Sequence, residues 1–174
     1  DKSTATNLLI WSATIFAPIA VLMTYTSWRE QKKLEIVSRM SEDELNQIEG
    51  LMCKIFELEN KFRVLLYNDG VTEKYKKEKI EFDFVLKSLH ELRDSSSFNR
   101  SKLTYFLNKV DRNIQNDFFE SYFNYLNILV IESDPKMMEL MVKVDNERIK
   151  KASDELFDKS KNYKILLLKY ISYS

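Results

Sequence analysis

The fold of this chain is decided by LLIWSATIFAPIAVLMTYTSW, residues 8–28, which contains no charged side chain. A helix needs about 20 apolar residues to cross the roughly 30 Å hydrocarbon layer of a bilayer. Trp11, Tyr25 and Trp28 lie near the two ends of the stretch, where amphipathic rings prefer the level of the lipid headgroups. We therefore predict a transmembrane anchor that occupies residues 1–28 together with its short N-terminal tail.

Pro18 lies near the middle of this stretch, where it removes one backbone donor and is expected to kink the helix. The alternative interpretation is a signal peptide that is cleaved from the mature protein. Such a peptide begins with a positively charged region and ends in a small-residue cleavage site. Residues 1–7 carry no net charge, and the apolar run leads directly into charge at Arg29. A retained anchor is therefore favoured.

The charges that flank the anchor predict its orientation. Only Lys2 precedes the apolar run, whereas a cluster of basic residues follows it: Arg29, Lys32, Lys33 and Arg39. Lysine and arginine are enriched on the cytoplasmic side of membrane helices. We therefore expect a single-pass protein of the cell inner membrane with a cytoplasmic C-terminal domain. Residues 29–40 would form a juxtamembrane stalk whose cations act in topology control, although they could also attract anionic lipids.

Composition places the remainder of the chain, residues 41–174, in the all-α class. The whole chain has only two glycines and two prolines, whereas an all-β domain needs these residues at many turns. We expect one cytosolic helical bundle of about five helices, connected by short loops.

Local signals predict where the first bundle helix begins and ends. Ser41 followed by Glu44 is typical of a capping box that starts a helix. Residues 68–70, Asn-Asp-Gly, indicate its end, because glycine readily adopts the left-handed conformation found there. Apolar residues spaced three and four apart predict its inward face: Leu45, Ile48, Leu51, Met52, Ile55, Leu58, Phe62, Leu65 and Leu66.

Turn-forming residues predict breaks further along the chain. A helix is expected over residues 73–93, followed by a loop, DSSSFN, at residues 94–99. Asn99 or Ser101 would cap the next helix, which runs to about residue 115. Asn and Asp at residues 116–117 indicate a short break.

The last part of the chain combines the most aromatic segment with a strong helix-start signal. Residues 118–132 contain three phenylalanines and two tyrosines, and we interpret them as the central helix rather than a partner groove or a second membrane span. Residues 133–135, Ser-Asp-Pro, predict the start of the final helix. That helix either runs to Ile171 or breaks near Ser160.

Residues that carry enzyme chemistry are scarce. His90 is the only histidine and Cys53 the only cysteine, and we interpret both as surface or packing residues. One of each does not supply the usual ligand set of a zinc site, and two glycines cannot build a nucleotide-binding loop. The 27 basic and 27 acidic residues balance, which gives no support for binding duplex nucleic acid. We therefore expect no enzyme activity, no metal and no cofactor.

One segment suggests an anion site. If residues 94–99 form a loop, then Ser96, Asn99, Arg100 and Lys102 lie at a helix start, where exposed N–H groups and the helix dipole favour an anion. The competing interpretation is a solvated loop with ordinary capping, and it is the favoured one.

Small residues predict self-association of the anchor. Ser12, Ala13, Ala17 and Ala20 give one face on which two helices can approach closely. A homo-oligomer in the lipid bilayer is therefore expected.

The order of anchor (residues 8–28), stalk (29–33) and helical bundle (41–174) resembles that of small bacterial single-span membrane proteins. Some of these are accessory proteins of antiviral defence, including CRISPR-associated ones that respond to cyclic oligonucleotides. The resemblance covers the whole chain and lies in architecture, without a shared motif. It implies a non-enzymatic membrane sensor or effector whose cytosolic bundle receives a cyclic nucleotide or a partner protein. The alternative is a passive adaptor that recruits a cytosolic partner to the membrane.

Overall fold

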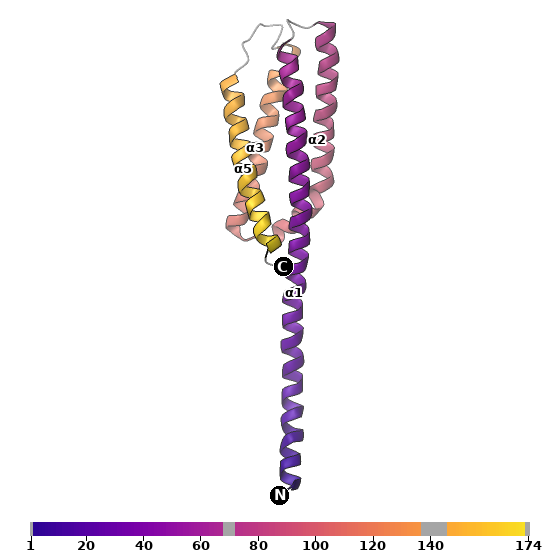
Figure 1. Ribbon diagram of the computed structural model, residues 1–174, viewed down its shortest axis with the longest axis vertical. Helices are drawn as coiled ribbons and strands as arrows, with labels where there is room; N and C mark the ends of the chain where they lie inside the picture. Colours follow the sequence, from indigo (N-terminus) through magenta and orange to yellow (C-terminus); the bar gives the residue numbers. More distant parts are fainter. Residues whose placement is uncertain (1, 68–71, 137–145, 173–174) are drawn as a thin grey trace.

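The computed structural model describes residues 2–67, 72–136 and 146–172, and regular secondary structure there is entirely helical. These ranges contain four helices, which are α1 (Lys2–Leu66), α2 (Glu73–Phe106), α3 (Lys109–Glu132) and α5 (Asn146–Ser172). Figure 1 shows α1 as a long rod, with the other three helices gathered around one half of it. The all-α class is confirmed, and the described ranges hold four helices rather than an anchor followed by about five.

A single helix of 65 residues, α1, joins the anchor, the stalk and the first bundle helix. The helix start expected at Ser41 is therefore wrong. Instead of capping a new helix, Ser41 Oγ donates a hydrogen bond to the carbonyl oxygen of Val37 one turn earlier, over 2.8 Å. This bond satisfies the hydroxyl inside a continuing helix. The helix also continues through Pro18 without interruption.

The bundle is an up-down-up-down arrangement in which each helix is antiparallel to the next (Figure 1). α1 packs between α2 and α5, and α5 packs against α3. The predicted inward face of the first bundle helix is confirmed, because Ile48, Ile55 and Phe62 are fully or almost fully buried. Residues 118–132 form the core of α3 as expected, with Phe118, Tyr122 and Tyr125 completely buried.

α2 runs straight through the expected loop at residues 94–99, so that prediction is wrong. Its serines do not interrupt the helix because their hydroxyls bond back to carbonyl oxygens of the preceding turn. Ser95 Oγ donates to Leu92, Ser96 Oγ to Arg93, and Ser101 Oγ to Ser97, all over 2.7–2.8 Å.

The break expected at residues 116–117 is also wrong, because α3 is continuous there. Of the two alternatives for the last helix, the run to Ile171 is confirmed, because α5 continues through Ser160. α3 begins instead after Asn108, whose side chain accepts a hydrogen bond from the Asp111 amide over 2.9 Å. The predicted helix end at residues 68–70 lies outside the described residues, as do residues 137–145, over which the final helix is expected to run.

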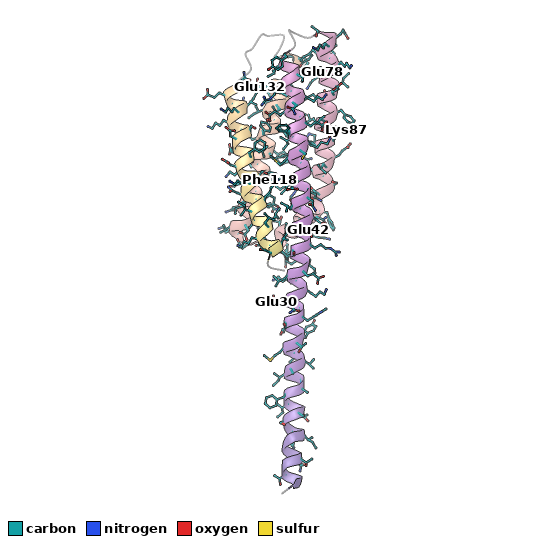
Figure 2. The ribbon with its side chains drawn as sticks, in the orientation of Figure 1. Glu30, Glu42, Glu78, Lys87, Phe118 and Glu132 are labelled. Atoms are coloured by element: carbon teal, nitrogen blue, oxygen red, sulfur yellow. The ribbon has the colours of Figure 1, made fainter. Side chains whose placement is uncertain are left out.

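The N-terminal half of α1 projects beyond the bundle and exposes its apolar side chains (Figure 2). By length and composition, this helix is long and apolar enough to cross a membrane. Two threonine hydroxyls in the apolar segment bond within the helix: Thr14 Oγ1 donates to the Ile10 carbonyl and Thr24 Oγ1 to the Ala20 carbonyl, over 2.7 and 2.8 Å. Internal bonds of this kind suit a segment surrounded by hydrocarbon.

Candidate functional site

The core of the bundle contains a charged contact between helices. On α1, Glu44 is 1% exposed. On α2, Arg100 donates from Nε to Glu44 Oε1 over 3.2 Å and from Nη2 to Ser96 Oγ. On α5, the Tyr163 hydroxyl donates to the same carboxylate oxygen, also over 3.2 Å. One carboxylate oxygen therefore joins three helices.

Two further side chains extend this contact to α3. Gln115 Nε2 donates to the Tyr163 hydroxyl oxygen over 2.8 Å, and Thr104 Oγ1 lies 2.7 Å from Gln115 Oε1, within hydrogen-bond distance. The polar network is the name used below for the whole set: Glu44, Ser96, Arg100, Thr104, Gln115 and Tyr163. It connects all four described helices.

Burial determines the electrostatics of the polar network. Loss of hydration raises the pKa of Glu44, and the Arg100 guanidinium opposes this rise. Burial likewise raises the pKa of Tyr163, and the adjacent Glu44 carboxylate adds to that rise. Among the described residues, Glu44 Oε2 has no hydrogen-bond partner. A buried ion pair contributes little net stability, but removal of one partner is costly because the other charge stays buried.

Arg100 is also held by an aromatic ring. Its guanidinium carbon lies 3.8 Å from the centroid of the Phe119 ring on α3, a position favourable for a cation–π contact. Phe119 in turn stands edge-on to Phe118, with ring centroids 4.9 Å apart. The aromatic segment of α3 thus forms one wall of the polar network.

A smaller polar cluster closes the end of the bundle nearest the projecting half of α1. The Tyr170 hydroxyl on α5 donates to Asp111 Oδ2 on α3 over 2.5 Å, and Asn108 Nδ2 donates to the same oxygen over 2.8 Å. Burial, the hydrogen bond and the charge of Asp111 raise the pKa of Tyr170 to about 12. Beside this cluster, Ser38 Oγ approaches the Ile171 carbonyl oxygen at 3.4 Å.

The residues of the predicted anion site do not lie at a helix start, because Ser96, Asn99, Arg100 and Lys102 all lie within α2. Ser96 and Arg100 belong to the polar network instead. Lys102 is exposed, and its Nζ lies 3.8 Å from the centroid of the Phe98 ring. The expected helix start, whose exposed N–H groups would have bound the anion, is therefore wrong. Binding of an anion by these four side chains stays a prediction.

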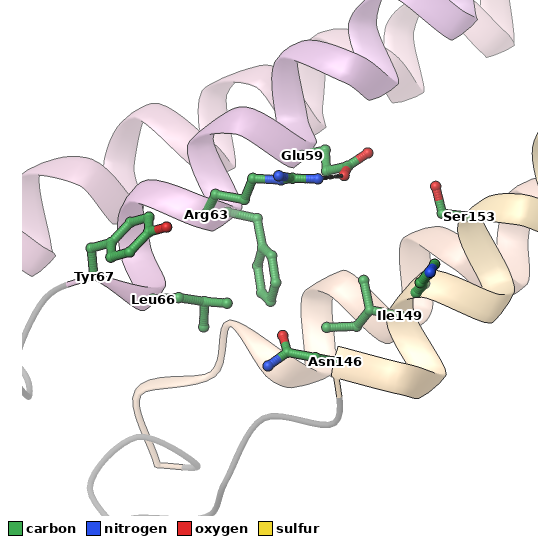
Figure 3. A pocket seen from close by; sticks show the side chains of 9 residues that line it. Glu59, Arg63, Leu66, Tyr67, Asn146, Ile149 and Ser153 are labelled. Carbon is green, nitrogen blue, oxygen red and sulfur yellow. Dashed lines mark hydrogen bonds and ion pairs between the residues drawn. The ribbon is translucent and has the colours of Figure 1, made fainter.

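An open pocket of about 460 Å³ lies between α1 and α5 at the far end of the bundle. Figure 3 shows its lining. Phe62, Leu66 and Ile149 provide apolar walls. Arg63 and Glu59 line the α1 side and are hydrogen-bonded to each other over 2.7 Å. The remaining lining residues are one cation and three uncharged polar residues: Lys150, Tyr67, Asn146 and Ser153. We call this the distal pocket.

The predicted anchor residues all lie on the projecting half of α1. Trp11 and Trp28 are 69% and 54% exposed. The Tyr25 and Trp28 rings lie side by side, with centroids 6.1 Å apart. Pro18 lies between these aromatic ends within the same helix. The large rings thus sit at the two ends of the apolar segment, as membrane-interface residues do.

Within the described residues, no group of three or more His, Cys, Asp and Glu side chains could hold a metal ion. Cys53 is a free, exposed thiol on α1, and His90 is half-buried on α2. The described side chains therefore offer a polar network that couples helices and a pocket between two of them. Comparison with protein-family models, curated proteins and solved structures finds no match for this chain.

Sequence reasoning missed the function of Glu44, Gln115 and Tyr163 in joining the helices. A usable signal exists for Glu44, because it lies four residues before Ile48 and seven before Leu51, on the buried face of α1. A carboxylate on such a face requires a partner. The spacing does not show which cation that partner is.

Proposed function

We propose that this protein is a non-enzymatic membrane sensor or effector, anchored in the inner membrane by the projecting half of α1. The cytosolic bundle receives a ligand or partner, with the distal pocket as the point of entry, and the anchors of several subunits respond in the bilayer. Assignment to bacterial antiviral defence follows from the resemblance in architecture alone.

The observation that carries this proposal is the continuity of α1. The same uninterrupted helix contributes Arg63 and Phe62 to the distal pocket and Trp11 to the apolar segment. Between Ile19 and Arg63 the helix is stiff, since no proline interrupts the hydrogen bonds between successive turns there. A change in packing at the pocket is therefore transmitted to the anchor without a flexible joint. A passive adaptor needs no such connection, because a loose tether would serve equally well.

Two insertions of equal length after Lys33 test the rigid connection. Seven alanines add about two helical turns, which nearly preserves the angular phase and keeps the stalk helical. Seven alternating glycines and serines add the same chain length as a flexible linker. Each variant is produced in bacteria, and a potential-sensitive dye reports the membrane potential.

The expected result is that the wild type and the alanine variant depolarise the membrane, whereas the glycine–serine variant does not. Depolarisation by both insertion variants would contradict the rigid connection. A wild type that inserts into the membrane but leaves the potential unchanged would contradict the effector proposal and favour the adaptor. Immunoblots of the membrane fraction confirm equal insertion of all three proteins.

A further inference from the structure

We infer that the end of the bundle nearest the anchor docks on anionic lipid headgroups. This inference rests on the proposed membrane anchoring and adds a second membrane contact to it. The surface concerned, which we call the basal face, surrounds the turn between α2 and α3 and the last turn of α5. Its exposed side chains are Lys102, Tyr105, Lys109, Val110, Arg112 and Lys169.

The position of the basal face follows from contacts at that end of the bundle. Tyr170 reaches Asp111 beside the α2–α3 turn, and Ser38 on α1 approaches the carbonyl of Ile171. The turn therefore lies at the level where α1 enters the bundle. Figure 2 shows Glu42 near this end and Glu30 below it on the projecting half of α1.

The basal face combines exposed apolar side chains with an excess of cations. Tyr105 is 82% exposed and Val110 is 67% exposed, although neither lies on the predicted membrane span. The carboxylate of this turn, Asp111, is 5% exposed and accepts hydrogen bonds from Tyr170 and Asn108. The Asp111 carboxylate is turned inward. Glu42 and Asp43 on α1 are exposed at this end, but the four exposed cations of the basal face outnumber them.

The stalk continues the same charge pattern. In the stalk, the exposed cations Arg29, Lys33 and Arg39 outnumber the exposed carboxylate Glu30, and Lys32 forms an ion pair with Glu35 over 2.6 Å. Because the chain as a whole carries no net charge, the positive excess beside the anchor is local. Anionic lipid headgroups are the partner that complements cations and rings at this position.

The length of the stalk permits the contact. From Trp28 to Val37, where burial in the bundle begins, the rise is about 14 Å at 1.5 Å per residue. The headgroup layer takes up about 5–8 Å of that distance. The remaining gap is comparable with the Debye length of about 8 Å at physiological salt. A helix tilt of about 20° would lower one edge of the bundle further.

The test uses the full chain reconstituted in vesicles, with an environment-sensitive NBD label on Val110→Cys in a Cys53→Ser background. Vesicles of phosphatidylcholine are compared with vesicles containing about one third phosphatidylglycerol. The label is expected to brighten and shift to the blue in the anionic vesicles only. Raising salt to about 1 M, where the Debye length falls to about 3 Å, should reverse the shift. A label on native Cys53, halfway along the bundle, should not respond.

A matched pair of charge variants identifies the basal cations. Changing Lys102, Lys109 and Lys169 to Gln should lower the ratio of docked to undocked protein about five-fold for each cation removed. Changing Lys74, Lys77 and Lys87 to Gln removes equal charge from other parts of the bundle and should leave the shift unchanged. The inference would be overturned if both variants reduced the fluorescence shift of the label equally, or if neither reduced it.

Two further outcomes distinguish failure of lipid docking from failure of the proposed membrane anchor. If the wild type fails to float with neutral vesicles, the anchor proposal fails, whatever the label reports. If it floats but the Val110 label responds equally in neutral and anionic vesicles, the anchor stands and lipid docking is overturned. A response that rises with protein density in neutral vesicles would identify a second copy of the chain as the occupant.

Discussion

Replacement of Arg100 by Met is expected to destabilise the bundle by about 3 kcal/mol at pH 7. Methionine keeps a long side chain against the Phe119 ring but removes the guanidinium beside Glu44. Because Glu44 is 1% exposed, the variant must protonate this carboxyl on folding. For a carboxyl of ordinary pKa 4.5, protonation at pH 7 costs about 3.4 kcal/mol, at 1.36 kcal/mol per pH unit. The cost should therefore shrink towards zero as the pH approaches 4.5.

The assay is urea unfolding of the full chain in detergent micelles, followed by the near-ultraviolet circular dichroism of the buried tyrosines. Titrations at about pH 5 and about pH 7 give the free energy of unfolding at each pH. Lys102→Met is the control, because it removes an exposed cation two residues away on α2 and should change stability by less than about 0.5 kcal/mol. A loss below about 1 kcal/mol in the Arg100 variant, or one independent of pH, would refute the reasoning.

The same titration checks three further changes. Glu44→Gln removes a carboxyl whose pKa is raised in the folded state. The stability that its proton confers on the wild type is present below pH 4.5 and is lost as the pH rises through the folded pKa. The variant should therefore gain stability relative to the wild type as the pH rises above 4.5. Phe118→Ala should cost about 3–5 kcal/mol because the ring is completely buried, whereas Phe157→Ala, at an exposed ring, should cost far less. Tyr163→Phe should cost about 1–3 kcal/mol, since it leaves Glu44 and Gln115 without a shared partner; an unchanged midpoint would contradict that assignment.

Apolar spacing in this sequence predicts the core more faithfully than polar residues predict the helix ends. The three-and-four spacing identifies Ile48, Ile55 and Phe62, which the structure buries. Burial of such a stripe is a long-range property that many residues specify together. By contrast, Ser41 and the serines at 95–97 are capping residues only where the chain leaves the helix. Inside a helix the same hydroxyls bond to carbonyls of the preceding turn.

The polar network could not be predicted in the same way. Glu44 lies 56 residues from Arg100 and 119 from Tyr163, so the contact exists only once α1, α2 and α5 have packed. The local pattern around Glu44 matches a capping box, and the pattern around Arg100 matches a helix start. Both local interpretations are wrong because tertiary packing outweighs the modest free energy of a helix cap.

If copies of the chain associate through their anchors, as proposed above, the unbroken course of α1 also sets the spacing between them. From Pro18 to Arg63 the helix rises roughly 68 Å, so a change in tilt of about 5° sweeps the distal pocket sideways by about 6 Å. Two anchors that cross near Pro18 at the common angle of about 20° would hold their distal pockets about 24 Å apart. In such a pair, a small change in the crossing angle inside the bilayer would produce a large displacement of the distal pockets. A partner that bridges two distal pockets would close that angle and repack the anchors.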